Sequence, residues 1–99
     1  MEKIVVEIDK DLEPIFGSFL ANRQKDVDLL KDAIASSSYD SIESIGHKLA
    51  GNAGSYGLSD LGEIGARLEQ SAIDSDMAAI EEDYKKYCDY LNNLEIKFV

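Results

Sequence analysis

The stretch MAAIEEDYKKYCDYLNNLEIKF, residues 77–98, repeats an apolar or aromatic side chain at alternating intervals of three and four residues. The repeating positions are Met77, Ile80, Tyr84, Tyr87, Leu91, Leu94 and Phe98. This spacing keeps the side chains on one side of an α-helix, and it is typical of helices that pack in bundles at crossing angles of about 20°. We therefore predict one long helix here, packed lengthwise against other helices.

Three further helices are predicted before this one. The first spans 14–35 and begins with a proline, whose fixed φ suits a first helical turn. The second spans 39–56, with Ser38 as its N-cap and Gly57 as the left-handed residue that ends it. Ser59 is predicted to cap the third helix. The loops between these segments are short, which favours antiparallel neighbours.

Each of the three earlier helices has one apolar face. The inward positions are Ile15, Phe16, Phe19, Leu20, Val27, Leu30 and Ile34 in the first, Ile42, Ile45, Leu49, Ala53 and Tyr56 in the second, and Leu58, Leu61, Ile64, Gly65, Leu68 and Ala72 in the third. Arg23 interrupts the first face, and we expect its stem to pack while its charged end reaches water.

The N-terminal residues are predicted to form an arm. Residues 3–8 have the composition of a strand but no predicted partner strand, so we expect them to lie extended against the bundle. Residues 9–13 suit one helical turn, because the proline that follows disfavours a longer one. The predicted fold is all-α: one domain, 1–99, in which an antiparallel up-down four-helix bundle, 14–99, follows a short arm and turn, 1–13.

The composition excludes several classes of function. The 99 residues include 10 basic and 20 acidic ones, and this net charge of −10 repels nucleic acid and anionic membranes. No apolar run is long enough to span a bilayer, and the acids near the start do not fit a signal peptide. A single cysteine, Cys88, excludes an internal disulfide and suits the cytoplasm. The initiating methionine and compact length favour a free-standing chain, which we expect to be a monomer.

The only histidine lies in IGHKLAGNAGSYG, residues 45–57. At ~100° per residue, His47 falls roughly 160° from the centre of the apolar face of its helix and points into water. The neighbouring side chains on that wet face are small, at Ser44, Gly51, Gly54 and Ser55. We interpret this face as a surface on which another protein docks and reaches the imidazole.

Glycines are unfavourable in this helix, because each costs about 1 kcal/mol relative to alanine. Such a departure from good helix formation is typical of functional sites. At Gly46, near the edge of the apolar face, we favour close packing of two helices as the reason. Gly51 lies on the exposed side one turn after His47, and there we favour clearance for a docking partner.

Two charged residues could assist His47. His47 lies eleven residues before Leu58, at the turn between the second and third helices, and Glu69 lies eleven residues after it, so an antiparallel pair brings both to one height. Glu69 could accept a hydrogen bond from the imidazole, or it could be an ordinary solvated acid. Lys48 lies about 100° around the helix from His47, and it is either a supporting cation or a solvated lysine.

The segment GHKLAGNAGSYGL, residues 46–58, resembles the signature of histidine-containing phosphotransfer (HPt) domains, which carry phosphoryl groups between histidine kinases and receiver domains. FLANR at 19–23 and LGEIGARLE at 61–69 are similar to the same family, so the resemblance covers nearly the whole chain. It implies that His47 is the phosphoacceptor through Nε2. The glycines and the polar residue that the family carries near the histidine match Gly51, Gly57 and Glu69. Many members have a lysine three residues after the histidine, where this chain has Ala50; whether Lys48 replaces it stays open.

The predicted function is therefore a phosphorelay carrier. A neutral imidazole has a lone pair for attack on phosphorus, and phosphoryl transfer needs mainly in-line positioning and charge stabilisation. The implied partners are response-regulator receiver domains, a hybrid histidine kinase, or both. We expect Mg²⁺ only in the receiver and no cofactor in this chain. The chain has no glycine-rich nucleotide loop, so we expect a carrier and not an enzyme that uses ATP.

Another class of function stays open, namely a helical adaptor that binds signalling partners without phosphate chemistry. The same helices would fold without His47, so the fold does not distinguish the two. We expect no metal site, because one histidine and one cysteine on different helices do not form a typical zinc site. No serine–histidine–acid set supports hydrolysis.

Overall fold

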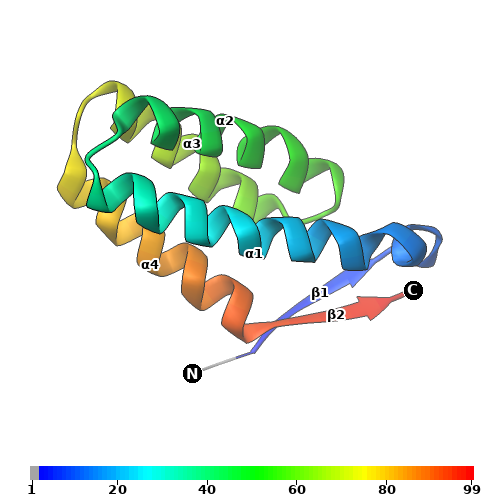
Figure 1. The fold of residues 1–99 in the computed structure, drawn as a ribbon. Coiled ribbons are helices and arrows are strands. Elements are labelled where there is room, and N and C mark those ends of the chain that lie inside the picture. The colour runs from blue at the N-terminus through cyan, green and yellow to red at the C-terminus, as the bar shows by residue number, and fades with distance from the viewer. Residues whose placement is uncertain (1–2) are drawn as a thin grey trace.

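The computed structural model describes residues 3–99; Met1 and Glu2, which the sequence assigns to the arm, lie outside the described residues. Four α-helices and two strands make up most of the chain (Figure 1). In chain order the elements are β1 (Ile4–Ile8), a 3₁₀ turn (Lys10–Leu12), α1 (Glu13–Ala35), α2 (Tyr39–Ser55), α3 (Ser59–Ile73), α4 (Met77–Asn93) and β2 (Leu94–Phe98). The four predicted helices and the short helical turn are confirmed.

The helix ends follow from local backbone chemistry. Gly57 has a φ of +82° and ends α2, as predicted, because glycine adopts left-handed φ without a steric penalty. Ser38 occupies the N-cap position of α2, but its hydroxyl donates to Ser41 Oγ at 2.9 Å instead of accepting from the backbone. The prediction that Ser59 caps α3 is wrong: Leu58 is the N-cap, and Ser59 is already the first helical residue.

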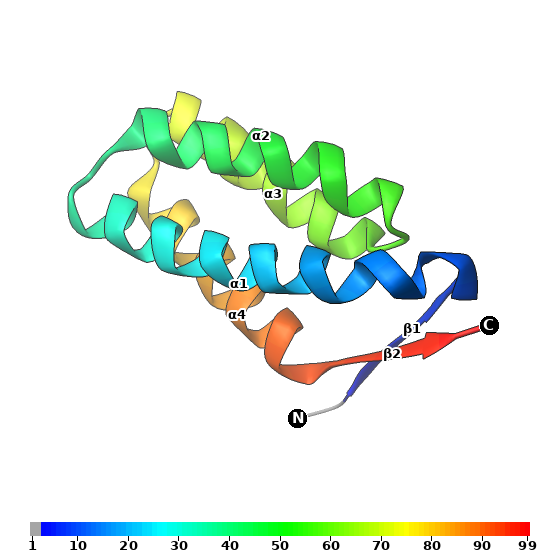
Figure 2. The same ribbon diagram turned by 45° about the vertical axis from the view of Figure 1, so that its right-hand side comes forward.

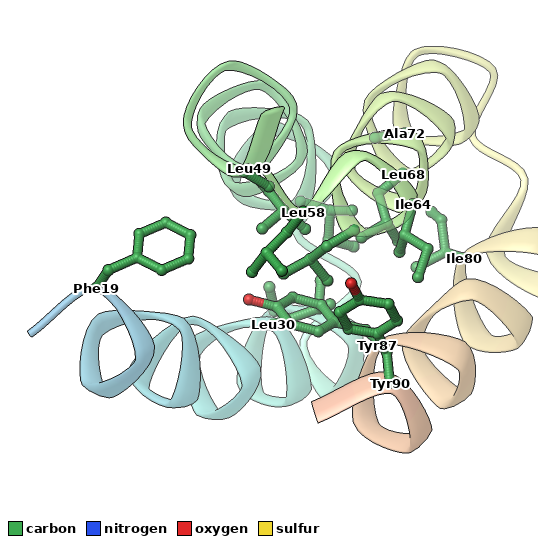
Figure 3. Packing of buried hydrophobic residues seen from close by; sticks show 14 of the residues in the cluster. Phe19, Leu30, Leu49, Leu58, Ile64, Leu68, Ala72, Ile80, Tyr87 and Tyr90 are labelled. Carbon is green, nitrogen blue, oxygen red and sulfur yellow. The ribbon is translucent and has the colours of Figure 1, made fainter. Parts of the chain in front are cut away.

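The core lies between the helices, where leucines of α1, α2 and α3 meet the aromatic rings of α4 (Figure 3). The α3 face and most of the α2 face are buried as predicted. In α1, the prediction for Ile15 is wrong, because it is 48% exposed. In α4, Tyr90 is buried although it lies outside the predicted stripe. The hydroxyl of buried Tyr87 donates to the carbonyl of Arg23 at 3.0 Å, which ties α4 to α1.

Arg23 does not reach water as predicted, because the residue is only 8% exposed. Its guanidinium lies over the Phe19 ring, 5.0 Å from the centroid. Its Nε is 2.9 Å from Oδ2 of Asp26, an ion pair that lacks the alignment of a hydrogen bond. Packing on an aromatic face and a nearby carboxylate together compensate for burying this charge.

The four helices agree with the predicted all-α class, but the prediction missed a pair of short strands and made the last helix too long. α4 ends at Asn93, and the chain then forms β2. Residues four apart lie on one face of a helix and also on one face of a strand. The spacing of Leu94 and Phe98 therefore fits both structures. Leu94 has extended backbone angles, φ −74° and ψ 128°, which break the helix.

The N-terminal segment has the strand partner that its sequence was predicted to lack. β1 pairs with β2 in parallel (Figures 1 and 2). The register sets Ile4 opposite Leu94 and Ile8 opposite Phe98. Beyond the strands, Val99 N–H donates to the carbonyl of Ile8 at 2.9 Å. The pairing satisfies backbone groups that an isolated extended arm would leave to water. Ile8 is buried, so the arm is part of the core.

Within residues 3–99, no helix combines the length and the apolar character needed to cross a membrane.

Candidate functional site

His47 lies near the middle of α2 and points away from the core. Its side chain is 75% exposed, whereas Gly46 and Leu49, its near neighbours in the chain, are buried. The difference follows from the helical period, because the apolar residues of α2 occupy the opposite face. The imidazole is thus held by a packed helix but remains open to a second molecule.

Glu69 of α3 contacts the imidazole. Its Oε2 lies 2.7 Å from Nδ1 of His47, so of the two alternatives for Glu69 the hydrogen bond to the imidazole is the one present. A carboxylate only accepts hydrogen bonds, so Nδ1 carries the proton in this contact. In a neutral ring, the lone pair then remains on Nε2, the nitrogen that does not contact Glu69. The contact therefore leaves Nε2 as the ring nitrogen with a lone pair that a second molecule could reach.

Two glycines bring α2 and α3 together next to this contact. A Cβ added to Gly46 would lie 2.6 Å from both the Glu69 nitrogen and the Gly65 carbonyl oxygen. A Cβ added to Gly65 would lie 2.6 Å from the Ala50 nitrogen. Later positions of α2 thus meet earlier positions of α3, and the backbones touch where side chains would normally separate them. The close packing predicted at Gly46 is confirmed, and it fixes His47 relative to Glu69.

The side chains around His47 on the exposed face of α2 are small, so little projects beside the imidazole. Added Cβ atoms at Gly51 and Gly54 would meet nothing within 4 Å, so both glycines border open space. Ser44 and Ser55 are exposed, and the Ser55 hydroxyl turns back to donate to the Gly51 carbonyl at 3.3 Å. Among residues 3–99, no packing requires glycine at position 51, which agrees with the interpretation that this face gives a partner access.

Lys48 is exposed beside His47. In the part of the chain that the structure describes, it forms neither an ion pair nor a side-chain hydrogen bond. Its ammonium group is therefore available to a molecule that approaches α2.

A groove between the C-terminal half of α1 and the N-terminal half of α2 was not predicted from the sequence. It has a volume of about 430 Å³ and is lined by Leu29, Asp32, Ala33, Ser36, Ser38, Ser41, Ser44 and Ile45. Leu29 is 56% exposed at its border. The groove reaches Ser44, one helical turn before His47, so it adjoins the predicted docking face.

Metal ligands do not gather at this site. Over residues 3–99, no group of three or more histidine, cysteine, aspartate or glutamate side chains is arranged to hold a metal ion. The chemistry of the site is that of one exposed imidazole, one oriented carboxylate and one free ammonium group.

In a comparison with known protein families, residues 14–95 match the family described as Hpt domain. The matched range begins at the second residue of α1 and ends at the second residue of β2, so it covers almost the whole of the four helices and includes the His47–Glu69 contact. No curated protein and no solved structure matches the chain.

Proposed function

We propose a function for this chain, which belongs to the Hpt domain family. In this proposal it accepts a phosphoryl group on His47 from a phospho-aspartyl receiver domain and passes it to another receiver. Hpt domains serve histidine phosphotransfer in phosphorelays. The observation that carries the assignment to His47 is its geometry: the ring is 75% exposed, and its Nδ1 is held by Glu69.

The proposed transfer is a single in-line displacement. The Nε2 lone pair attacks the phosphorus of the aspartyl phosphate, the N–P bond forms, and the P–O bond to the aspartate breaks to release a carboxylate. The imidazole becomes positively charged as the bond forms, while Nδ1 keeps its proton. Glu69 stabilises that charge through the 2.7 Å hydrogen bond. Donation to a second receiver is the same step in reverse.

The receiver is proposed to supply Mg²⁺ and most of the groups that neutralise the transferred phosphoryl charge. Lys48 is the candidate cation of this chain, because it is exposed next to His47 and has no carboxylate partner among the described residues. In this proposal the chain is a carrier without a nucleotide site, and it acts in the cytoplasm.

The proposed docking surface is the face of α2 around His47, formed by Ser44, Gly51, Gly54 and Ser55. The open space at Gly51 and Gly54 supports this assignment, because a receiver must bring its aspartate close to the ring. The groove between α1 and α2 adjoins this surface and offers Leu29 and Ile45 to an apolar side chain of the partner.

Incubation with a phosphorylated receiver domain tests the proposal. Transfer should give an acid-labile, alkali-stable label on this chain, and His47→Gln should take up none. Lys31→Gln, on an exposed position of α1, is the matched control and should accept label like the wild type. If the wild type binds the receiver but never carries label, the chain is an adaptor and the carrier proposal is wrong.

A further inference from the structure

The outer edge of β2 has no partner among the described residues. β1 and β2 form a sheet of two strands only, in the order β1-β2. In Figures 1 and 2, β2 lies at the rim of the molecule, and no helix passes in front of it. A sheet of two strands alone has only marginal stability, and an open strand edge readily pairs with another chain.

The backbone groups on this edge can be assigned. Val99 donates to the Ile8 carbonyl and accepts from the Lys10 N–H, so its N–H and C=O both face β1. Successive residues of a strand direct these groups to opposite edges, in alternation. Phe98 and Ile96, one and three residues before Val99, therefore direct their N–H and C=O groups to the outer edge.

The side chains of β2 are arranged symmetrically about Ile96. Glu95 and Lys97 flank it, and both are exposed on the outer face of the sheet. Neither forms an ion pair within residues 3–99. The inner face carries half-buried Leu94 and Ile96, followed by Phe98, whose ring packs against Phe16 at 5.8 Å.

An antiparallel copy of β2 matches this order in one register. With Ile96 opposite its own copy, Glu95 lies opposite Lys97, and Leu94 lies opposite Phe98. Directly opposite residues share one face of a sheet, so every charged pair is attractive and every inner pair is apolar. Ile96 then exchanges both backbone hydrogen bonds with its copy, because its N–H and C=O face outward.

Neighbouring registers are worse. A slip of one residue in the pairing places charged side chains opposite apolar ones on the wrong face. Moving the two-fold axis to Glu95 or to Lys97 sets like charges directly opposite, which is destabilising. In β1 the comparable register, about Val5, sets Lys3 opposite Glu7, but Lys3 lies before the first residue of the strand. Only β2 carries both charges of its pair within the strand.

We propose that β2 is a self-association edge, through which two copies of this chain pair antiparallel about Ile96 to form a four-stranded sheet. The partner is a second copy because the charge order of the edge is complementary to itself. A two-fold symmetric contact of this kind is the commonest form of homodimer. The strand has five residues, so the contact is small and the dimer depends on concentration. This inference differs from the monomer expected from the sequence and is independent of phosphotransfer.

Sedimentation equilibrium of the whole chain from about 10 µM to about 1 mM tests the proposal. The average mass should rise from that of one chain, 10.9 kDa, toward that of two. Glu95→Lys alone and Lys97→Glu alone should each weaken association about tenfold or more, because each sets like charges opposite. An equimolar mixture of the two variants should restore it, since the two positive side chains of one variant then face the two negative side chains of the other.

Lys3→Glu, the same charge change at the residue just before β1, is the matched control and should leave association unchanged. Circular dichroism of each variant checks folding; if a reversal unfolds the chain, Glu95→Gln and Lys97→Gln replace it, with partial loss expected. A chain that stays monomeric over the whole range would overturn the proposal. So would association that Lys3→Glu abolishes, or that the mixture of charge variants fails to restore. His47→Gln should associate like the wild type, which separates this result from the phosphotransfer assay.

Discussion

His47 and Glu69 lie 22 residues apart in the sequence, yet Nδ1 of one is 2.7 Å from Oε2 of the other. They come from different helices, so the contact depends on how closely α2 and α3 approach. Gly46 and Gly65 allow that approach, because a Cβ on either glycine would meet the backbone of the opposite helix. The orientation of the imidazole is thus a consequence of helix packing beneath it.

Removing the Glu69 carboxylate should slow transfer. Glu69→Ala leaves Nδ1 without its partner, and losing one such hydrogen bond, about 1–2 kcal/mol, corresponds to roughly a tenfold lower rate. Glu69→Gln keeps an acceptor oxygen and should lie between the alanine variant and the wild type. Single-turnover transfer from a phosphorylated receiver measures the effect, with Glu63→Gln, an exposed acid of the same helix, as the control. Wild-type rates in Glu69→Ala would show that the contact has no role in transfer.

A methyl group at the helix crossing should destabilise the fold. Gly46→Ala and Gly65→Ala both force the backbones of α2 and α3 apart, and overpacking of this kind costs about 1–3 kcal/mol. Gly17→Ala is the matched control: its added Cβ meets nothing within 4 Å, so it should stabilise the chain by up to about 1 kcal/mol. Urea denaturation measures all three. Equal stability of Gly46→Ala and wild type would disprove the close crossing.

A bulky side chain on the docking face should block transfer and leave folding intact. Gly51→Arg projects into open space, so its free energy of unfolding should equal or exceed that of the wild type. Its transfer rate should fall at least about tenfold if steric exclusion removes about 1.4 kcal/mol or more of docking free energy. Gly17→Arg, equally open but on α1, should transfer normally. A Gly51→Arg chain that accepts phosphate at the wild-type rate would contradict the proposed surface.

Stability should fall in alkali because of two buried tyrosines of α4. Burial raises the pKa of Tyr90 to about 12 from its ordinary 10.0, and burial raises the pKa of Tyr87 further. As the pH rises, the two tyrosines therefore ionise in the unfolded chain before they ionise in the folded one. The free energy of unfolding is unaffected by them below pH 10 and falls as the pH rises toward 12. Tyr90 alone lowers the free energy of unfolding by about 1 kcal/mol by about pH 11.

Urea denaturation at about pH 8 and about pH 11, on either side of the ordinary tyrosine pKa, checks this expectation, and Tyr90→Phe should reduce the difference between the two. Equal stability of the wild type at both pH values would contradict it.

Much of the helical fold could be predicted because its side chains repeat with the helical period. The inward faces of α2 and α3 are confirmed by this means. The helical period gave a wrong prediction at Leu94 and Phe98, because their four-residue spacing suits a strand equally well. Burial of Asp83 was also missed, because its carboxylate is compensated by Arg67 of α3, whose Nε donates to it at 3.1 Å. No local pattern around Asp83 encodes that partner.

The candidate site was predictable where it depends on one helix or on one turn. The outward direction of His47 follows from the helical period of α2. Its position opposite Glu69 along the α2–α3 pair follows from counting residues on either side of Leu58. The groove beside Ser44 was not predictable, because it depends on how α1 and α2 sit against each other. Spacing within one helix contains no such information.

The most direct test of phosphotransfer through His47 is to locate the phosphoryl group after transfer, using NMR of the chain labelled with ¹⁵N in its one histidine. We predict phosphate on Nε2 of His47, with the proton retained on Nδ1 opposite Glu69. Phosphate on Nδ1, on another residue, or nowhere in the presence of a competent phosphorylated receiver would contradict the proposed role of this imidazole.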